Sequence, residues 1–387
     1  MNVLTIETES KLPVAIQRFD DLSREVYGVM GLTIDALDFR KLMNAIEEAS
    51  VKTAPCLIST PNVNFLVTSR RNSDFRESLL RSNLCLADGM PLIWIAKLLG
   101  IPIRERVTGA DLFESLKLAE GRRRRLRVFL FGGADGLAEM VCKNLNASNI
   151  GMECVGALYP GFGTIDEMST NHVIDAINSS GADLLAVFLG AEKAQTWLLR
   201  NHDRIKIPVR AQFGAAINFE AGTIKRAPAI LRNSGLEWLW RIKEEPYLWR
   251  RYWADGRSLL AMLFTHAFPL AVIFCWARLH IGDPNEGFSV DAREDGSLVV
   301  VSLSGSAIAQ YIGDAADRFR AALASKKDIV IQCSQVQMVD PRFMGLLLMV
   351  RKQLVCRGQT LSFVEVPHAV RRTFRLNGFD FLLSNNG

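Results

Sequence analysis

The chain has little of what marks a metal site or a disulfide framework. Its 387 residues include seven cysteines and five histidines, but no CxxC pair and no cysteine spaced with histidine as zinc ligands are. Such spacings are the usual sequence signs of a zinc site or of a small disulfide-stapled fold. We therefore expect neither, and a reducing compartment suits the chain best.

A large excess of one charge and an export signal are also missing. Lys and Arg number 46 against 41 Asp and Glu, a net charge of +5 that is too small to indicate nucleic acid as a partner. Residues 1–26 carry acids early and contain no apolar core with a cleavage site, so they do not predict a secretory signal. Their apolar residues follow no clear helix or strand period, and we interpret them as an N-terminal extension.

The remaining chain is typical of a globular protein, with 49% hydrophobic and 22% charged residues and a length that suits two domains. In residues 27–222, apolar runs alternate with amphipathic helical stretches such as Phe39–Ala49 and Leu137–Leu145. This alternation predicts an α/β, Rossmann-like domain whose mainly parallel sheet is covered by helices on both faces. The expected strands are Pro55–Ser59, Leu84–Ala87, Arg127–Phe131, Cys154–Ala157, Asp183–Leu189 and Val209–Phe213.

Residues 223–280 have a different character, because they are dense in Trp and Arg and then strongly apolar. The twenty residues Ser258–Ala277 contain no Asp, Glu, Lys or Arg, and a helix of that length reaches about 30 Å, the thickness of a bilayer core. Thr265, His266 and Pro269 in its middle suit a clean span poorly. We expect membrane association by insertion, by re-entry or by lying in the interface; a buried core helix is the alternative.

A linker, residues 281–289, is rich in turn-forming residues, and residues 290–387 form a second, small α/β domain. Its expected strands are Leu298–Ser302, Asp328–Cys333 and Thr360–Val364, and its expected helices are Ile312–Ala324, Arg342–Cys356 and Val370–Leu376.

Polar residues follow two of the strands expected in the first domain. Asp88 and Gly89 come after Leu84–Ala87, where α/β sheets bind ligands, and a carboxylate there can accept a proton from a substrate hydroxyl. Asp88 is alternatively the N-cap of the next helix, and the Asp88-Gly89 dipeptide alone favours the cap. Thr60, Asn62 and Asn64 follow Pro55–Ser59 as possible substrate ligands, with turn chemistry around the intervening proline as the alternative.

Two further segments suit phosphate groups. Arg106 and Thr108 precede Gly109 at an expected helix start, where a guanidinium fork and oriented N–H groups can hold a diphosphate. A solvated turn explains them equally well. Gly132 and Gly133 follow the strand Arg127–Phe131 and lead into a helix, which is the geometry of a nucleotide cradle, although the full GxGxxG pattern is missing.

Taken together, these segments resemble one family, the WecG/TagA/CpsF glycosyltransferases. The resemblance covers roughly residues 27–252 and is carried by TPN (Thr60–Asn62), ADGMP (Ala87–Pro91), RVTGADL (Arg106–Leu112), FLFGG (Phe129–Gly133), FLGAEKAQTW (Phe188–Trp197) and FEAGTIKRAP…GLEWLWR…EP…LWRRY, which ends at Tyr252. It implies transfer of a sugar, with inversion, from a UDP-sugar to a saccharide linked to a polyprenyl diphosphate during surface polysaccharide synthesis.

The resemblance also implies residue roles. Asp88 would be the general base, Thr60 and Asn62 part of the substrate pocket, and Arg106 a ligand of the diphosphate. No DxD-type motif follows an expected strand, so no metal and no other cofactor is expected. It further implies that the Trp- and Arg-rich appendage after residue 222 brings the protein to the cytoplasmic face of the plasma membrane, peripherally or partly inserted through 236–277.

Two departures from the family pattern leave a second reading open. Ala194 stands where the family usually has glutamine, so the glutamine of this loop is Gln195, one position later, and we count it among the substrate-binding candidates. Ile217 and Asn218 replace an expected Phe and Asp. These changes alter the pocket, either toward another substrate or toward loss of activity. If activity is lost, the protein would be a non-catalytic membrane-associated scaffold.

The second domain resembles a STAS domain through VVVSLSG (Val299–Gly305), DIVIQCSQVQMVDPRFMGLLL (Asp328–Leu348) and GQTLSFVEV (Gly358–Val366). Signalling members carry a phosphorylated Ser or Thr directly after the Asp that heads a helix, but here Pro341 follows Asp340. We therefore expect docking of a protein partner rather than a phosphorylation switch. Packing on its own enzyme is the alternative.

Overall fold

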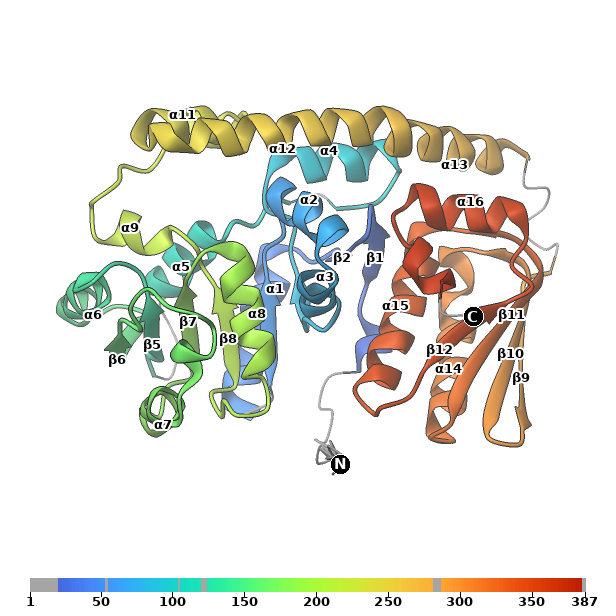
Figure 1. Ribbon diagram of the computed structural model, residues 1–387, viewed down its shortest axis with the longest axis horizontal. Coiled ribbons are helices and arrows are strands. Elements are labelled where there is room, and N and C mark those ends of the chain that lie inside the picture. The colour runs from blue at the N-terminus through green and yellow to red at the C-terminus, as the bar shows by residue number, and fades with distance from the viewer. Residues whose placement is uncertain (1–19, 53–54, 104, 120–123, 281–286, 385–387) are drawn as a thin grey trace, which may run out of the picture.

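The protein was analysed as a computed structural model, which describes residues 20–52, 55–103, 105–119, 124–280 and 287–384. Most of the expected N-terminal extension (1–19) and of the expected linker (281–286) lies outside the described residues. The two larger sheets stand side by side, and one long helical segment runs across both along the upper edge of Figure 1.

The N-terminal sheet confirms the expected α/β fold. Its six strands are parallel and lie in the order β4-β3-β8-β7-β5-β6. Side chains alternate between two cores along each central strand: Val128 and Leu130 face one, and Phe129 and Phe131 face the other. The strands are β3 (Cys56–Ser59), β4 (Leu84–Cys85), β5 (Leu126–Gly132), β6 (Met152–Leu158), β7 (Leu184–Phe188) and β8 (Val209–Gln212).

Helices cover both faces of this sheet, as expected for parallel strands. One core receives side chains from α1, α5, α6 and α9, and the opposite core receives them from α7 and α8, where Trp197 stacks on Phe131 at 4.4 Å between ring centroids. The helices are α1 (Phe39–Lys52), α2 (Val63–Arg71), α3 (Ser73–Leu80), α4 (Met90–Leu98), α5 (Gly109–Leu118), α6 (Leu137–Ser148), η2 (Glu167–Ser169), α7 (Asn171–Ser179), α8 (Ala191–Arg200), α9 (Ala216–Glu220) and α10 (Ala229–Asn233).

Two cysteines correct the expectation drawn from their spacing. Cys142 on α6 and Cys154 on β6, twelve residues apart, form a disulfide. A single pair at this separation has no distinctive sequence pattern, because only the packing of the helix on the strand brings the two sulfurs together.

An antiparallel hairpin that the sequence analysis did not predict joins the two halves of the molecule. Strands β1 (Val26–Val29) and β2 (Leu32–Asp35) are connected by Met30 and Gly31, both at positive φ. Two-residue hairpin turns of this kind usually carry Asn-Gly or Asp-Gly, so Met-Gly gives no turn signal. The turn is held from outside, since Asn377 accepts from Met30 N–H at 2.7 Å and donates to the Gly28 carbonyl at 3.0 Å.

The long helical segment lies along the protein instead of projecting from it. It comprises α11 (Glu237–Glu244), η3 (Pro246–Leu248), α12 (Trp249–Met262), a π-helical turn η4 (Leu263–Ala267) and α13 (Phe268–His280). Within the described residues, the stretch Pro246–Ala277 is the one helix long and apolar enough to cross a membrane, and 22% of its most apolar window is buried. Leu270 and Phe274 point into the core, while Phe264 and Val272 are exposed.

The C-terminal sheet has the order β12-β11-β10-β9, with β9 antiparallel to β10 and the other pairs parallel. Helices α14 and α15 pack on one face, which confirms a small α/β domain. Strand β9, at the end of the expected linker, was not predicted. The elements are β9 (Ser289–Asp295), β10 (Leu298–Ala307), η5 (Ala309–Tyr311), α14 (Ile312–Ala324), β11 (Asp328–Val339), α15 (Pro341–Val355), β12 (Leu361–Val364), α16 (His368–Leu376) and η6 (Asp380–Leu383).

The two domains share a core instead of meeting only through a linker. Leu22 and Val26 are buried with the C-terminal residues, and the backbones approach so closely that a Cβ added to Gly345 would lie 2.0 Å from the Val26 carbonyl oxygen. Residues 20–26, assigned from sequence to the extension, thus form η1 (Asp21–Ser23) and the start of β1 inside this interface. The C-terminal domain does pack on its own N-terminal partner, as the alternative interpretation held.

Candidate functional site

Backbone hydrogen bonds bring three of the predicted loops together at the carboxyl ends of β3 and β4. Asp88 N–H donates to the Pro61 carbonyl at 2.8 Å, and Val107 N–H donates to the Ala87 carbonyl at 3.0 Å. The TPN, ADG and RVTG segments therefore lie side by side, at the edge of a parallel sheet where ligands bind.

Asp88 is not the cap of the helix that follows it. Gly89, at φ 112°, occupies the N-cap position of α4, and no side chain caps that helix. The Asp88 carboxylate instead accepts from Gly109 N–H at the start of α5. The cap interpretation, which the dipeptide alone favoured, is wrong because the positive φ of Gly89 turns the chain before the helix begins.

The environment of Asp88 suits a base. The residue is partly exposed at the surface, but the surrounding protein desolvates its carboxylate, and this desolvation raises the pKa of Asp88 to about 8. The charge of Arg106 opposes the rise in pKa, whereas Glu237 and Asp111 add to it. A carboxylate with a pKa near neutrality accepts a proton far more readily than an ordinary aspartate does.

Arg106 lies in a cluster of charged side chains that we call the arginine cluster. It consists of three arginines and three acids: Arg106, Arg226, Arg232, Asp111, Glu114 and Glu237. Arg106 contacts Glu237 at 3.0 Å and Asp111 at 3.6 Å, and Arg226 pairs with Asp111 and Glu114. Since most of these side chains are only partly buried, an anionic ligand can compete with the acids for the guanidinium groups.

Thr108 and Gly109 begin α5 beside this cluster. Thr108 is the N-cap, accepting from Asp111 N–H at 2.9 Å and donating its hydroxyl proton to the Asp111 carboxylate at 2.7 Å. A Cβ on Gly109 would lie 3.4 Å from the Phe213 Cα, so glycine allows the helix start to approach the end of β8. Thr108 and Gly109 thus fix where α5 begins beside the arginine cluster.

In the TPN segment, the described contacts are those of a helix start. Thr60 is buried, and Asn62 caps α2 by accepting from Asn64 N–H at 3.0 Å and Phe65 N–H at 3.3 Å. Asn64 donates its side-chain amide to Asp255 of α12 at 3.3 Å. Asn64 therefore connects the loop at the candidate site to the long helical segment.

Gly132 and Gly133 lie at the end of β5, next to the end of β7. The segments that follow these two strands leave toward opposite edges of the sheet, so this is a point where α/β proteins bind ligands. Close packing also explains why residue 132 is a glycine, because a Cβ on Gly132 would lie 2.9 Å from the Phe188 carbonyl oxygen. The structure places them away from β3 and β4, with two strands between.

Gln195 corrects a prediction. Its side chain is 0% exposed and donates to Ser59 Oγ at 2.8 Å, inside the protein between α8 and β3. It therefore supports the strand that leads to Thr60 and does not face a substrate. Its neighbour Ala194 is equally buried in the core.

The sequence analysis did not single out Asp111, Arg226 or Glu237. All three lie inside the motifs that carry the family resemblance, which was the available signal. Their pairing joins segments more than a hundred residues apart, so only the fold could show it. In the described parts of the chain, no three His, Cys, Asp or Glu side chains are grouped to hold a metal ion.

A cavity of about 330 Å³ lies apart from these residues, where the C-terminal end of α4, α13 and the C-terminal domain meet. Its lining includes Leu99, Phe274 and Met338, and none of the predicted site residues lines it.

Comparison with known proteins confirms the resemblances. Residues 27–270 match the sequence model of the glycosyl transferase WecG/TagA/CpsF family, and residues 290–384 match that of the Mlab, STAS domain. Two relatives are named N-acetylglucosaminyldiphosphoundecaprenol N-acetyl-beta-D-mannosaminyltransferase. The one from Bacillus spizizenii is 26% identical over 55% of this chain and 79% of its own length, and the one from Bacillus subtilis is 24% identical over 54% and 78%.

Proposed function

Because the chain belongs to the WecG/TagA/CpsF family of glycosyl transferases, we propose that it transfers a sugar from a UDP-sugar to a saccharide carried on a polyprenyl diphosphate. The relatives' names supply the class of acceptor, and the setting would be synthesis of a surface polysaccharide of the exopolysaccharide, capsule or teichoic type. The single observation that carries the proposal is Asp88, a desolvated carboxylate of raised pKa beside Arg106, a member of the arginine cluster.

In the proposed reaction, Asp88 takes the proton of an acceptor hydroxyl as that oxygen attacks the anomeric carbon of the donor sugar. The bond from this carbon to the UDP oxygen breaks on the opposite face, so the configuration inverts. The bonding electrons leave with UDP, whose negative charge needs stabilisation. Positioned guanidinium groups supply it without a metal ion in this mechanism.

Arg106 is the arginine best placed for the diphosphate, because its charge already acts on Asp88. Its contacts with Glu237 and Asp111 occupy the guanidinium in the ligand-free protein. A diphosphate carries more charge than one carboxylate and can replace Glu237 as its partner. Because Glu237 belongs to α11, we propose that donor binding changes how the long helical segment is held at this end.

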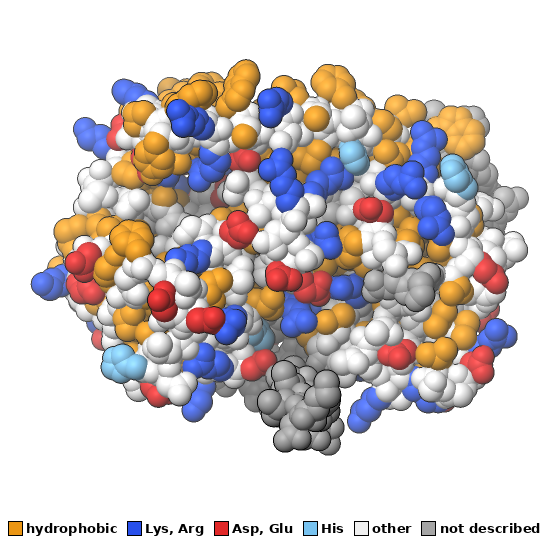
Figure 2. Space-filling view, viewed as in Figure 1, with side chains coloured by type: hydrophobic (Ala, Val, Ile, Leu, Met, Phe, Trp, Pro, Cys, Tyr) orange, Lys and Arg blue, Asp and Glu red, His pale blue; other side chains and the backbone are white. Residues whose placement is uncertain are grey.

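We propose that the outward face of the long helical segment lies on the cytoplasmic face of the plasma membrane. Figure 2 shows hydrophobic side chains along the upper edge of the molecule with Lys and Arg among them. Exposed Trp and Arg together suit the boundary between acyl chains and anionic headgroups. In α12, η4 and α13, the exposed large apolar residues are Trp249, Trp253, Leu260, Phe264, Phe268, Val272 and Trp276, and the exposed arginines among them are Arg250, Arg251 and Arg257.

The enzymatic proposal is tested by release of UDP from a panel of UDP-sugars, with polyprenyl-diphosphate-linked N-acetylglucosamine as the first acceptor. We expect turnover with one donor and a product whose anomeric configuration, read by NMR, is inverted. Turnover should fall at least about a hundredfold in Asp88→Asn and persist in Asp74→Asn, an exposed acid on α3. Binding of a donor without turnover by any of the panel would instead support the scaffold, which the changes at Ala194 and Asn218 favour.

The membrane proposal needs point substitutions, because deleting the segment would also remove Leu270 and Phe274, which are part of the core. We expect the purified protein to float with vesicles that contain anionic lipid. Trp253→Asp combined with Phe264→Asp should leave it in the soluble fraction. Asp74→Asn, on α3 and outside the long helical segment, serves as the control, and flotation of the Asp variant would rule out the proposed surface.

A further inference from the structure

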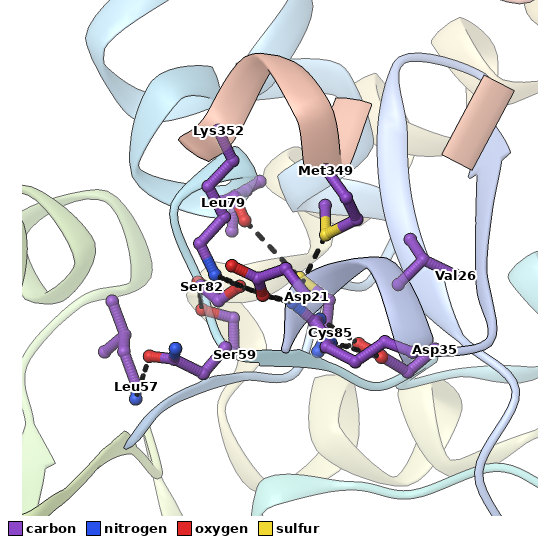
Figure 3. A network of polar contacts seen from close by, with 12 residues as sticks. Asp21, Val26, Asp35, Leu57, Ser59, Leu79, Ser82, Cys85, Met349 and Lys352 are labelled. Atoms are coloured by element: carbon purple, nitrogen blue, oxygen red, sulfur yellow. Dashed lines mark hydrogen bonds and ion pairs between the residues drawn. The ribbon is translucent and has the colours of Figure 1, made fainter. Parts of the chain in front are cut away.

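A network that includes four charged side chains lies between the two domains (Figure 3). Arg24 donates to Asp21 at 2.6 Å and to both oxygens of Asp35, at 3.1 and 2.8 Å. Lys352, on α15 of the C-terminal domain, donates to Asp21 at 2.8 Å. The two cations and two anions balance, and each side chain is at most 9% exposed.

The network reaches the strand that carries the proposed base. Strand β4 is at the edge of the N-terminal sheet and is hydrogen-bonded to β3. On its other side, Cys85 N–H donates to Asp35 at 2.7 Å. Cys85 precedes Asp88 by three residues, so this carboxylate holds the strand directly before the turn that presents the base.

A second branch reaches β3. Lys352 also donates to the Ser82 carbonyl at 3.2 Å, and the Ser82 hydroxyl is hydrogen-bonded to the Ser59 hydroxyl at 2.7 Å. Ser59 is the last residue of β3 and directly precedes Thr60. One lysine of the C-terminal domain thus connects to the strands on which two of the candidate-site loops begin.

We propose that Lys352 is a positioning residue of the transferase: through Asp21, Arg24 and Asp35 it fixes β4, and with it Asp88, in the geometry for transfer. The inference rests on the proposed function for the role of Asp88. It makes the STAS-type domain part of the catalytic unit instead of an appended module.

The charge balance gives the mechanism. Without Lys352, Arg24 is the remaining cation of this network for two buried carboxylates, Asp21 and Asp35. Its guanidinium then shifts toward Asp21, because an unpaired buried carboxylate is costly. The Asp35 carboxylate loses its fixed orientation, and the hydrogen bond to Cys85 N–H weakens.

A neighbouring ion pair provides a matched control. Arg351, next to Lys352 on α15, donates to Glu77 of α3 at 2.9 and 3.0 Å. This pair crosses the same domain interface, and no described hydrogen bond links it to β4. Arg351→Met therefore weakens the docking of the domains while leaving the hold on Cys85 intact.

The test compares full-length Lys352→Met and Arg351→Met by hydrogen exchange and by steady-state kinetics. We expect exchange at Cys85–Asp88 to become about tenfold faster in Lys352→Met alone. Its kcat should fall about ten- to a hundredfold, since small displacements of a reacting group have effects of that size, with the donor KM within about twofold. Equal losses in both variants would show ordinary interface destabilisation and overturn the proposal.

A rescue experiment distinguishes an effect of lost charge balance from an effect of lost packing. In the double variant Asp21→Asn/Lys352→Met the network is neutral again, so exchange at Cys85–Asp88 and kcat should return most of the way to the parent values. No recovery would overturn the proposal. If Lys352→Met does not fold, this double variant is compared with Arg351→Met instead. If the parent protein transfers no sugar, the proposed function fails, while the exchange measurements still decide whether Lys352 holds β4.

Discussion

Desolvation acts on both Asp21 and Asp88, yet their pKa values move in opposite directions. At Asp21 burial alone would raise the pKa, but Lys352 and Arg24 outweigh it, and the pKa is lowered. At Asp88 burial prevails over the charge of Arg106, and the pKa rises to about 8. The two Asp21 cations bond it directly, whereas Arg106 is bonded to Glu237 and Asp111.

The difference extends to the groups around each aspartate. Side chains of the interdomain network are 0–9% exposed, whereas those of the arginine cluster are 14–47% exposed. A partly solvated cluster can exchange an acid for an anionic ligand, but a buried network has no such substitute. The arginine cluster therefore suits ligand binding and proton transfer, whereas the interdomain network suits a fixed geometry.

The largest expected effect is on the base. Asp88→Asn removes the proton acceptor but keeps the size of the side chain, so kcat should fall about 100- to 10,000-fold, the usual contribution of general-base catalysis. Thermal unfolding should show that the variant is folded. A kcat within tenfold of the parent value would exclude Asp88 as the base.

Removing one cation from the interdomain network and one from the arginine cluster tests how burial changes the cost of breaking an ion pair. Arg24→Met leaves Asp21 and Asp35 without a shared partner and should lower the free energy of unfolding by about 3–5 kcal/mol. Arg232→Met in the arginine cluster should lower it by about 1 kcal/mol or less, because water replaces the lost contact. Urea titration of both proteins measures the contrast, and equal losses would contradict it.

The raised pKa of Asp88 predicts how activity depends on pH. Transfer requires the ionised carboxylate, and a pKa of about 8 leaves it mostly protonated at neutral pH. We therefore expect kcat/KM to rise about tenfold per unit below pH 8 and to level off above it. A profile that is flat from pH 6 to 9 would contradict the assignment.

A smaller effect is expected from Glu237→Gln. The negative charge of Glu237 raises the pKa of Asp88, so its removal should move the rising limb of the pH profile to lower pH. The same change frees Arg106 for the diphosphate and should lower the donor KM by about fivefold at most, since a partly solvated ion pair contributes little. Glu244→Gln, on the same helix, is the control.

Several features were readable from the sequence because they depend on local pattern. Alternating apolar runs gave the parallel sheet, and the charge-free stretch Ser258–Ala277 gave the long helix. The β1–β2 hairpin escaped prediction because Met30 takes its turn conformation from contact with Asn377, almost 350 residues away. Gln195 was misplaced for a related reason: its motif position does not reveal that its side chain points into the core.

The sequence by itself determined the two domain types, the apolar helix and the order of the motifs, since periodicity and motif spacing are properties of neighbouring residues. Tertiary structure decided what each charged residue does. Nothing in the local sequence distinguishes Asp21 as the partner of Lys352 from Asp88 as a carboxylate of raised pKa. That distinction arises from desolvation and from charges brought in by distant segments, and both exist only after the chain has folded.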